Sequence, residues 1–175
     1  MNAYPAGNSM IIRSATQEDL NRVLEIDRLS FPAPWTPHRL KIALKDIFFV
    51  IEQKEIIGYL VACICDLGIR AEILRIAVHP DHRGKGVAKE LLEASLRIFS
   101  KNYIVEVGLY VNSANRTAEK LYERLGFKIT KNFTFLDDQD FHIFHEMKLE
   151  LLEVKEMENQ SWEKLCPEDV DHAIQ

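Results

Sequence analysis

The pattern of apolar and polar residues centres on one strand, a glycine-rich turn and a helix. Residues 73–78 form a near-continuous apolar run, which predicts a buried strand. Pro80 ends that strand, because proline cannot donate to a β ladder. Apolar or small side chains then recur at the spacing of one helix face, at Val87, Leu91, Leu92, Ala94, Ser95 and Ile98. We therefore expect the chain to fold around this strand, turn and helix.

The same patterns predict further elements on both sides. The expected strands are residues 10–14, 47–53, 56–64, 71–78, 103–111, 127–135 and 141–149. The expected helices are residues 17–30, 37–44, 87–98 and 114–125. This order, β-α-α-β-β-β-α-β-α-β-β, is typical of a mixed α/β sheet with helices on both faces.

Several helix ends carry capping signals. Thr16, with an acid three residues later, fits a capping box, and Thr36 fits an N-cap followed by proline. Ser113 is the expected cap of the helix at 114–125, and Gly126 follows that helix at a position that favours positive φ.

Composition restricts the class of protein. The chain of 175 residues is long enough for one domain with a core, and no apolar run approaches the roughly 20 residues that span a bilayer. Residues 151–175 hold two basic and seven acidic side chains, which accounts for the net charge of −5. We expect no membrane segment and no nucleic-acid surface, since the latter needs a basic face.

The cysteines and histidines predict no metal site. Three cysteines without framework spacing fit free thiols, so we expect a cytoplasmic protein. Cys63 and Cys65 would share one strand face and pack in the core. His142 and His145 would lie on opposite faces of a strand, and we expect His79 and His82 to be structural or exposed.

The glycine-rich turn predicts an anion site. Glycines in the turn at 83–88 let backbone N–H groups approach a ligand, and the helix N-terminus adds partial positive charge. The turn matches neither a Walker loop nor a dinucleotide fingerprint, because Lys89 stands where the latter needs glycine. A phosphate or pyrophosphate is the expected ligand.

Two motifs give the chain a family resemblance. Arg83, Gly86 and Ala88 fit [Q/R]-x-x-G-x-[G/A], and residues 115–127 fit N-x-x-A-x-x-L-Y-x-x-x-G-F. Both patterns, in this order, resemble the cofactor segments of the GNAT family of N-acetyltransferases. The resemblance runs from about Met10 to Leu149. It implies the GNAT fold, a central mixed and mostly antiparallel sheet that splays between two parallel strands, with helices on both faces. It also divides the chain into a flexible N-terminus (1–9), a GNAT domain (10–149) and an acidic C-terminal extension (150–175).

The resemblance implies that acetyl-CoA is the acetyl donor, held in the cleft between the splayed strands. The loop N–H groups would hold the pyrophosphate, with added charge from Arg83. The backbone of residues 76–78 would pair with pantetheine, and the Val78 N–H would meet the thioester oxygen. Lys89, Arg116 and Lys120 would be near the 3′-phosphate or else be ordinary surface charge. The implied cofactor-binding residues are Ile76, Ala77, Val78, Arg83, Gly84, Lys85, Gly86, Val87, Ala88, Asn115, Ala118, Lys120 and Tyr122.

Three residues are candidates for the chemistry. The resemblance implies that Tyr122 is the general acid that protonates the leaving thiolate; the alternative is a core aromatic on an amphipathic helix. Glu72, in the setting A-E-I found in histone-type members, is one candidate base. Tyr110 is the second, because it stands where the similar ribosomal-protein alanine N-acetyltransferases hold a catalytic glutamate. A tyrosine there would position a water that relays the proton.

The leading interpretation is acetyl transfer to a primary amine by direct attack in a ternary complex. The α-amine of a protein N-terminus, such as that of a ribosomal protein, is the favoured acceptor. The alternatives are a small amine, such as a polyamine or an amino acid, and a non-catalytic CoA-binding module. The oligomer is expected to be a monomer or homodimer.

The acceptor would approach over the first helix pair and the last hairpin. Phe31, Trp35, Phe133 and Phe135 would line a slot for a small N-terminal side chain, and Asp137, Asp138 and Asp140 would attract a cationic peptide or polyamine. The alternative for all of these residues is loop packing and solvation. The acidic extension would be either a solvated or subunit-crossing tail or a flap that steers a cationic substrate.

Overall fold

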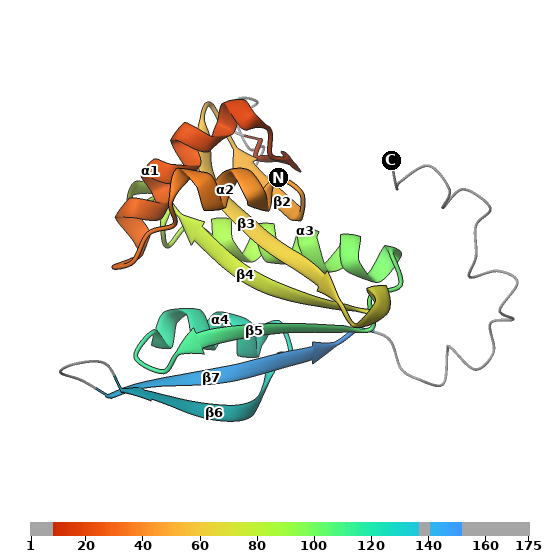
Figure 1. Cartoon of the computed structure of the whole chain (residues 1–175). Helices are drawn as coiled ribbons and strands as arrows, with labels where there is room; N and C mark the ends of the chain where they lie inside the picture. Colours follow the sequence, from red (N-terminus) through yellow and green to blue (C-terminus); the bar gives the residue numbers. More distant parts are fainter. Residues whose placement is uncertain (1–8, 137–140, 152–175) are drawn as a thin grey trace, which may run out of the picture.

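A seven-stranded sheet forms the centre of the computed structural model, which describes residues 9–136 and 141–151 (Figure 1). The strands are β1 (Ile11–Ser14), β2 (Ile47–Glu52), β3 (Ile56–Cys65), β4 (Arg70–Val78), β5 (Glu106–Asn112), β6 (Lys128–Leu136) and β7 (Phe141–Glu150). The helices are α1 (Leu20–Ser30), α2 (Pro37–Ala43), α3 (Val87–Lys101) and α4 (Arg116–Arg124), with short 3₁₀ turns η1 (Gln17–Asp19), η2 (Asp66–Gly68) and η3 (Pro80–His82).

The sheet has the strand order β1-β2-β3-β4-β5-β7-β6, and the pair β4–β5 is its parallel pair. Every other neighbouring pair is antiparallel. Helices α1 and α2 pack on one face through a core cluster that includes Val23, Ile26 and Leu40. Helices α3 and α4 pack on the other face through a second cluster that includes Leu91 and Tyr122. The predicted mixed sheet with helices on both faces is confirmed.

The two parallel strands separate along their length. They pair from Arg70 opposite Glu106 to Ile73 opposite Leu109, and the pairing ends there. A β-bulge leaves Leu74 as an extra residue against β3, at the point where the pairing with β5 stops. Because a bulge bends its strand and increases the twist, the remainder of β4 turns away from β5. Figure 1 shows this divergence. We call the unpaired ends, Leu74–Val78 of β4 and Tyr110–Asn112 of β5, the splay.

Most local predictions hold, and three are corrected. The Thr16 capping box, the Thr36 N-cap and the positive φ of Gly126 are all present. The strand expected to begin at Tyr103 begins at Glu106, because Tyr103 takes a φ of 61° in the turn that follows α3.

The other two corrections concern helices. Asn115 caps α4 in place of Ser113, since its Oδ1 accepts the Ala118 N–H at 3.2 Å. In α3, Phe99 occupies the buried face, whereas Ile98 is exposed. Among the described residues, no helix is both long enough and apolar enough to cross a membrane.

Candidate active site at the splayed strands

The turn between β4 and α3 presents unpaired backbone donors. Gly84 and Gly86 have φ of 72° and 81°, and a Cβ at either position would meet no atom within 4 Å. These glycines therefore serve the backbone conformation and leave the surface above them open. The first backbone bond of α3 runs from the Glu90 N–H to the Gly86 carbonyl, at 3.0 Å. The N–H groups of the preceding helical turn have no acceptor within the helix, which suits an anion.

The basic side chains of this turn hold the loop in place. Arg83 Nε donates to the Val78 carbonyl at 3.0 Å, and its guanidinium also donates to the Ser30 hydroxyl at 3.0 Å. Lys85 Nζ donates to the Asp81 carbonyl at 2.8 Å. The turn is thus tied to the end of β4 and to α1. Arg83 was expected to add charge at the pyrophosphate, but in this structure it donates its hydrogen bonds to Val78 and Ser30.

The free edge of β4 offers backbone groups to the splay. The His79 N–H donates to the Ile57 carbonyl of β3 at 2.8 Å. Because the backbone groups of an antiparallel strand alternate in direction, Ala77 also turns toward β3, and Ile76 and Val78 turn toward the splay. Of the three residues expected to pair with pantetheine, Ile76 and Val78 therefore have the required backbone direction. Ala77 does not.

Tyr122 lies on the α4 side of the splay. Its side chain is packed in the core and is 7% exposed, with its ring 5.9 Å from that of Phe127. Burial raises the pKa of the Tyr122 phenol to about 12, so the group keeps its proton at neutral pH. Among the described residues, the Tyr122 hydroxyl has no hydrogen-bond partner, and its oxygen is not fully enclosed by protein atoms.

Glu72 lies on β4 directly before the splay, on the sheet face that carries α1 and α2. Its carboxylate extends over the backbone of Gly108 on β5, where a Cβ would come within 2.6 Å of Glu72 Oε2. Burial raises the pKa of this carboxyl group, and the negative charge of Glu146 raises it further. Glu72 is therefore a carboxylate with increased basicity beside the splay.

Tyr110 and Glu146 form a hydrogen-bonded pair beside Glu72. Tyr110 lies opposite Glu146 in the β5–β7 register, and its hydroxyl donates to Glu146 Oε1 at 3.4 Å. Partial desolvation and the charges of Glu72 and Glu146 raise the pKa of the Tyr110 phenol, so Tyr110 is a neutral donor. Glu146 was not singled out from the sequence. The alternation along β7 places it on this face, but only the register brings it to Tyr110.

A buried ionic cluster fixes the segment between α1 and α2. Asp27 is fully buried and accepts hydrogen bonds from the Trp35 N–H at 2.6 Å, from Arg75 Nε at 2.7 Å and from the Tyr59 hydroxyl. The Arg75 guanidinium also stacks on the Phe31 ring at 3.6 Å. The segment is irregular, as expected, and these contacts join it to β4.

The residues expected along the acceptor path differ in how exposed their side chains are. Trp35 is 7% exposed and belongs to the core, so the expectation that it lines an acceptor slot is wrong. Phe133 packs against Tyr110 with ring centroids 5.8 Å apart, and Phe135 is largely exposed. The three aspartates at 137, 138 and 140 and the tail from 152 lie outside the described residues.

The cysteines and histidines of the described segments form no metal site. Cys63 lies opposite Glu72 in the β3–β4 register, and Cys63 and Cys65 are both half-buried rather than in the core as expected. His79 accepts the Asp81 N–H at 3.3 Å and so caps η3. His145 contacts Asn132 at 2.7 Å.

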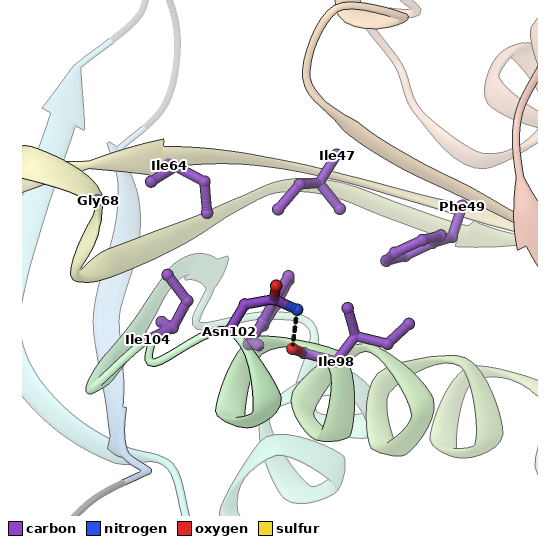
Figure 2. Close-up of a pocket in the computed structure, with 8 residues that line it drawn as sticks. Ile47, Phe49, Ile64, Gly68, Ile98, Asn102 and Ile104 are labelled. Carbon is purple, nitrogen blue, oxygen red and sulfur yellow. Dashed lines mark hydrogen bonds between the residues drawn. The ribbon is translucent and has the colours of Figure 1, made fainter. Parts of the chain in front are cut away.

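A separate apolar pocket of about 330 Å³ lies on the α3 side of the sheet, far along β3 and β4 from the splay (Figure 2). Its lining is Ile47, Phe49, Ile64, Gly68, Ile98, Phe99, Asn102 and Ile104. The side chain of Asn102 donates to the Ile98 carbonyl at 2.8 Å, which completes the C-terminal turn of α3. No acid, base or nucleophile lines this pocket, so the chemistry is assigned to the splay.

Comparison with known proteins finds a matching protein family and similar acetyltransferases. Residues 20–127 match the sequence model of the acetyltransferase (GNAT) family. An N-alpha-acetyltransferase of Saccharolobus solfataricus is 29% identical over 140 residues, which cover 71% of this chain and 84% of that protein. A ribosomal protein bS18-alanine N-acetyltransferase of Haemophilus ducreyi is 27% identical over 132 residues, which cover 73% and 91%.

The fold also matches solved structures. The ribosomal-protein-S18-alanine N-acetyltransferase from Escherichia coli superposes with a TM-score of 0.78 at 21% identity. The match covers 88% of this chain and all of that chain. The chain therefore shares its fold with this solved structure.

Proposed function

Because the chain belongs to the acetyltransferase (GNAT) family, we propose that it transfers the acetyl group of acetyl-CoA to the α-amine at a protein N-terminus. The chain is an N-acetyltransferase with acetyl-CoA as its donor. The identity of the acceptor and the roles of individual residues belong to the proposal. The observation that carries it is the placement of Glu72, whose carboxylate lies beside the splay with a raised pKa.

The donor side of the site fits acetyl-CoA. The N–H groups at the start of α3 and the open turn at Gly84 and Gly86 would hold the pyrophosphate. The free backbone edge of Ile76 and Val78 would pair with the amides of pantetheine, as an added strand pairs with a sheet edge. This pairing would direct the thioester toward Glu72 and Tyr122. The Val78 N–H would donate to the thioester oxygen as negative charge develops there.

The proposed base, Glu72, begins the reaction without a proton, and the proposed acid, Tyr122, begins it with one. Glu72 would accept one proton from the acceptor amine as the nitrogen attacks the thioester carbon. The C–S bond then breaks, and Tyr122 would give its proton to the thiolate, since its buried phenol is protonated at neutral pH. One N–C bond forms and one C–S bond breaks. Solvent returns the proton to Tyr122 and removes the one on Glu72.

An α-amine suits a carboxylate base of this kind. Its pKa is near 8, against about 10.4 for a lysine side chain, so a larger fraction is neutral or easily deprotonated at neutral pH. The relatives named for N-alpha and ribosomal-protein alanine acetylation act on such amines. Their names support an N-terminal acceptor here, and the exposed Tyr110 and Phe133 would contact its first residues.

A substrate panel tests the proposal. Thiol release from acetyl-CoA is measured with peptides that begin with Ala, Ser, Met or Thr, with an N-terminally blocked peptide that holds an internal lysine, and with spermidine and free amino acids. We expect turnover on the peptides with free N-termini, ranked by first residue. Turnover confined to the small amines would assign the chain to that acceptor class. Binding of CoA without turnover on any amine would support a binding module.

A further inference from the structure

Glu146 is held on the sheet by two neutral donors. Tyr110 donates to Oε1 at 3.4 Å, and the Thr130 hydroxyl donates to Oε2 at 2.5 Å. Thr130 is the extra residue of a β-bulge, because the register of β6 against β7 shifts between Ile129 and Lys131. Bulges re-aim side chains, and this one turns the Thr130 hydroxyl toward Glu146. Both oxygens of a carboxylate that is only 8% exposed therefore have a fixed partner.

Among the charged groups around Glu72, Glu146 differs from the others because its hydrogen-bond donors are uncharged. The titratable or charged groups that face Glu72 are Cys63 and Cys65 of β3, Arg70 of β4, Glu106 and Tyr110 of β5, and Glu146 and Lys148 of β7. Arg70 is paired with Asp66 and Glu106, and Lys148 Nζ lies 3.1 Å from Glu106. The two cations near Glu72 are thus compensated by other acids. The hydrogen-bond donors to Glu146 are uncharged, and Lys131, its register partner, contributes at longer range.

These surroundings shift the pKa values of the Glu72 and Glu146 carboxyl groups in opposite directions. The Thr130 hydrogen bond lowers the pKa of Glu146, so this group stays ionised. Burial raises the pKa of Glu72, and the ionised Glu146 raises it further. Neighbouring acids that are shifted in opposite directions are the usual arrangement when only one of them exchanges a proton during a reaction.

We propose that Glu146 is a positioning residue of the acetyl transfer, which fixes the Tyr110 hydroxyl and keeps a negative charge beside Glu72, so that Glu72 takes the proton of the acceptor amine. The inference rests on the proposed function and assigns a role that neither motif includes. Tyr110 is then a hydrogen-bond donor and not the base. The proton moves from the amine nitrogen to a Glu72 oxygen, and the Tyr110–Glu146 hydrogen bond stays intact throughout.

The test compares Glu146→Gln, which removes the charge but keeps the shape, with Glu146→Asp, which keeps the charge. Glu150→Gln is the control, because Glu150 is an exposed acid farther along the same strand. The pH profile of kcat is recorded at saturating acetyl-CoA and peptide. We expect the acid limb of Glu146→Gln to move to lower pH by roughly 0.3 to 1 unit, the effect of one charge at this range. The limb should stay near its wild-type position in Glu146→Asp and Glu150→Gln.

An acid limb that does not move in Glu146→Gln would overturn the inference, as would an equal movement in Glu150→Gln. A second measurement uses wild-type protein, Glu72→Gln and Glu146→Gln. Carboxyl carbon NMR with labelled glutamate follows the titrations of Glu72 and Glu146, each of which is assigned by its loss in the corresponding variant. We expect Glu72 to titrate above the ordinary glutamate value of about 4.3 and above Glu146. The reverse order would contradict the inference.

The two measurements separate the inference from the proposed function. The NMR titration requires no acceptor, so it remains decisive even where no N-terminal peptide is turned over. Turnover on N-terminal peptides together with an unmoved acid limb would leave the function standing and remove the role of Glu146.

Discussion

The carboxylate of Glu72 occupies the space that a side chain at Gly108 would fill. A Cβ on Gly108 would lie 2.6 Å from Glu72 Oε2, which is closer than non-bonded atoms approach. The two residues are register partners on the parallel strands β4 and β5, at the last rows before the splay. Glycine at 108 therefore allows Glu72 to lie across β5 toward β7.

Gly108→Ala should displace the Glu72 carboxylate and lower kcat/KM by about tenfold or more, because a misplaced base loses much of its effect. Acetyl-CoA affinity should stay near the wild-type value. The change is made in the wild-type and in the Glu72→Gln background, and steady-state kinetics are compared. In the second background it should have little further effect, since residues in contact are not additive. Equal losses in both backgrounds would show that Gly108 acts independently of Glu72.

Glu72 should also determine part of the pH dependence. A raised pKa means that the group is protonated, and inactive as a base, over a wider acid range than an ordinary glutamate. The rate should therefore fall as pH decreases through a value above about 4.3. In Glu72→Gln, kcat should fall by roughly 10² or more and this limb should disappear. Peptides with different α-amine pKa values identify the limb, because the one that belongs to the acceptor moves with the peptide and the one that belongs to Glu72 does not.

The glycine turn should bind the pyrophosphate through its backbone. Gly86→Ala places a Cβ on this surface, and Gly68→Ala is a matched control, because Gly68 has a φ of 91° and open space but lies at the opposite end of β4. Each change should cost about 1–2 kcal/mol of folding stability, since a non-glycine residue is strained in this region. Calorimetry should show at least about a tenfold loss of CoA affinity for Gly86→Ala only. Equal affinities in both variants would move the phosphate site elsewhere.

Tyr122→Phe removes a hydroxyl that we assign to protonation of the leaving thiolate. The Tyr122 ring is packed in the core, so the variant should fold, and acetyl-CoA should bind as before. Turnover should fall by roughly 10² or more. Tyr103→Phe serves as the control, because Tyr103 is exposed in the turn after α3. A Tyr122→Phe enzyme with wild-type kcat would leave this tyrosine with a packing role only.

The elements with strong local patterns were predictable. The apolar run at 73–78 and the helix from Val87 need no distant information, and both are present. The start of β5 was missed because residues 103–105 are as apolar as a strand, although Tyr103 takes a positive φ where the chain turns after α3. Propensity cannot register such a turn when no glycine marks it.

The parts of the site that lie within one sequence motif were predictable. The parts that depend on the register between distant strands were not. The turn at Gly84 and Gly86 lies within one short segment. Glu146 joins the site only through the register of β5 with β7. Likewise, Trp35 is aromatic and close to the site in sequence, but the buried Asp27 accepts its backbone N–H and the side chain packs in the core. These relationships depend on contacts between distant segments, which periodicity does not encode.

The position of the transferred acetyl group tests the central claim most directly. One peptide with both a free α-amine and an internal lysine is incubated with the wild-type enzyme and acetyl-CoA, and fragment mass spectrometry locates the added group. We expect the acetyl group on the α-amine, with Glu72→Gln strongly slowed on the same peptide. Acetylation of the lysine side chain, with the α-amine left free, would contradict the account.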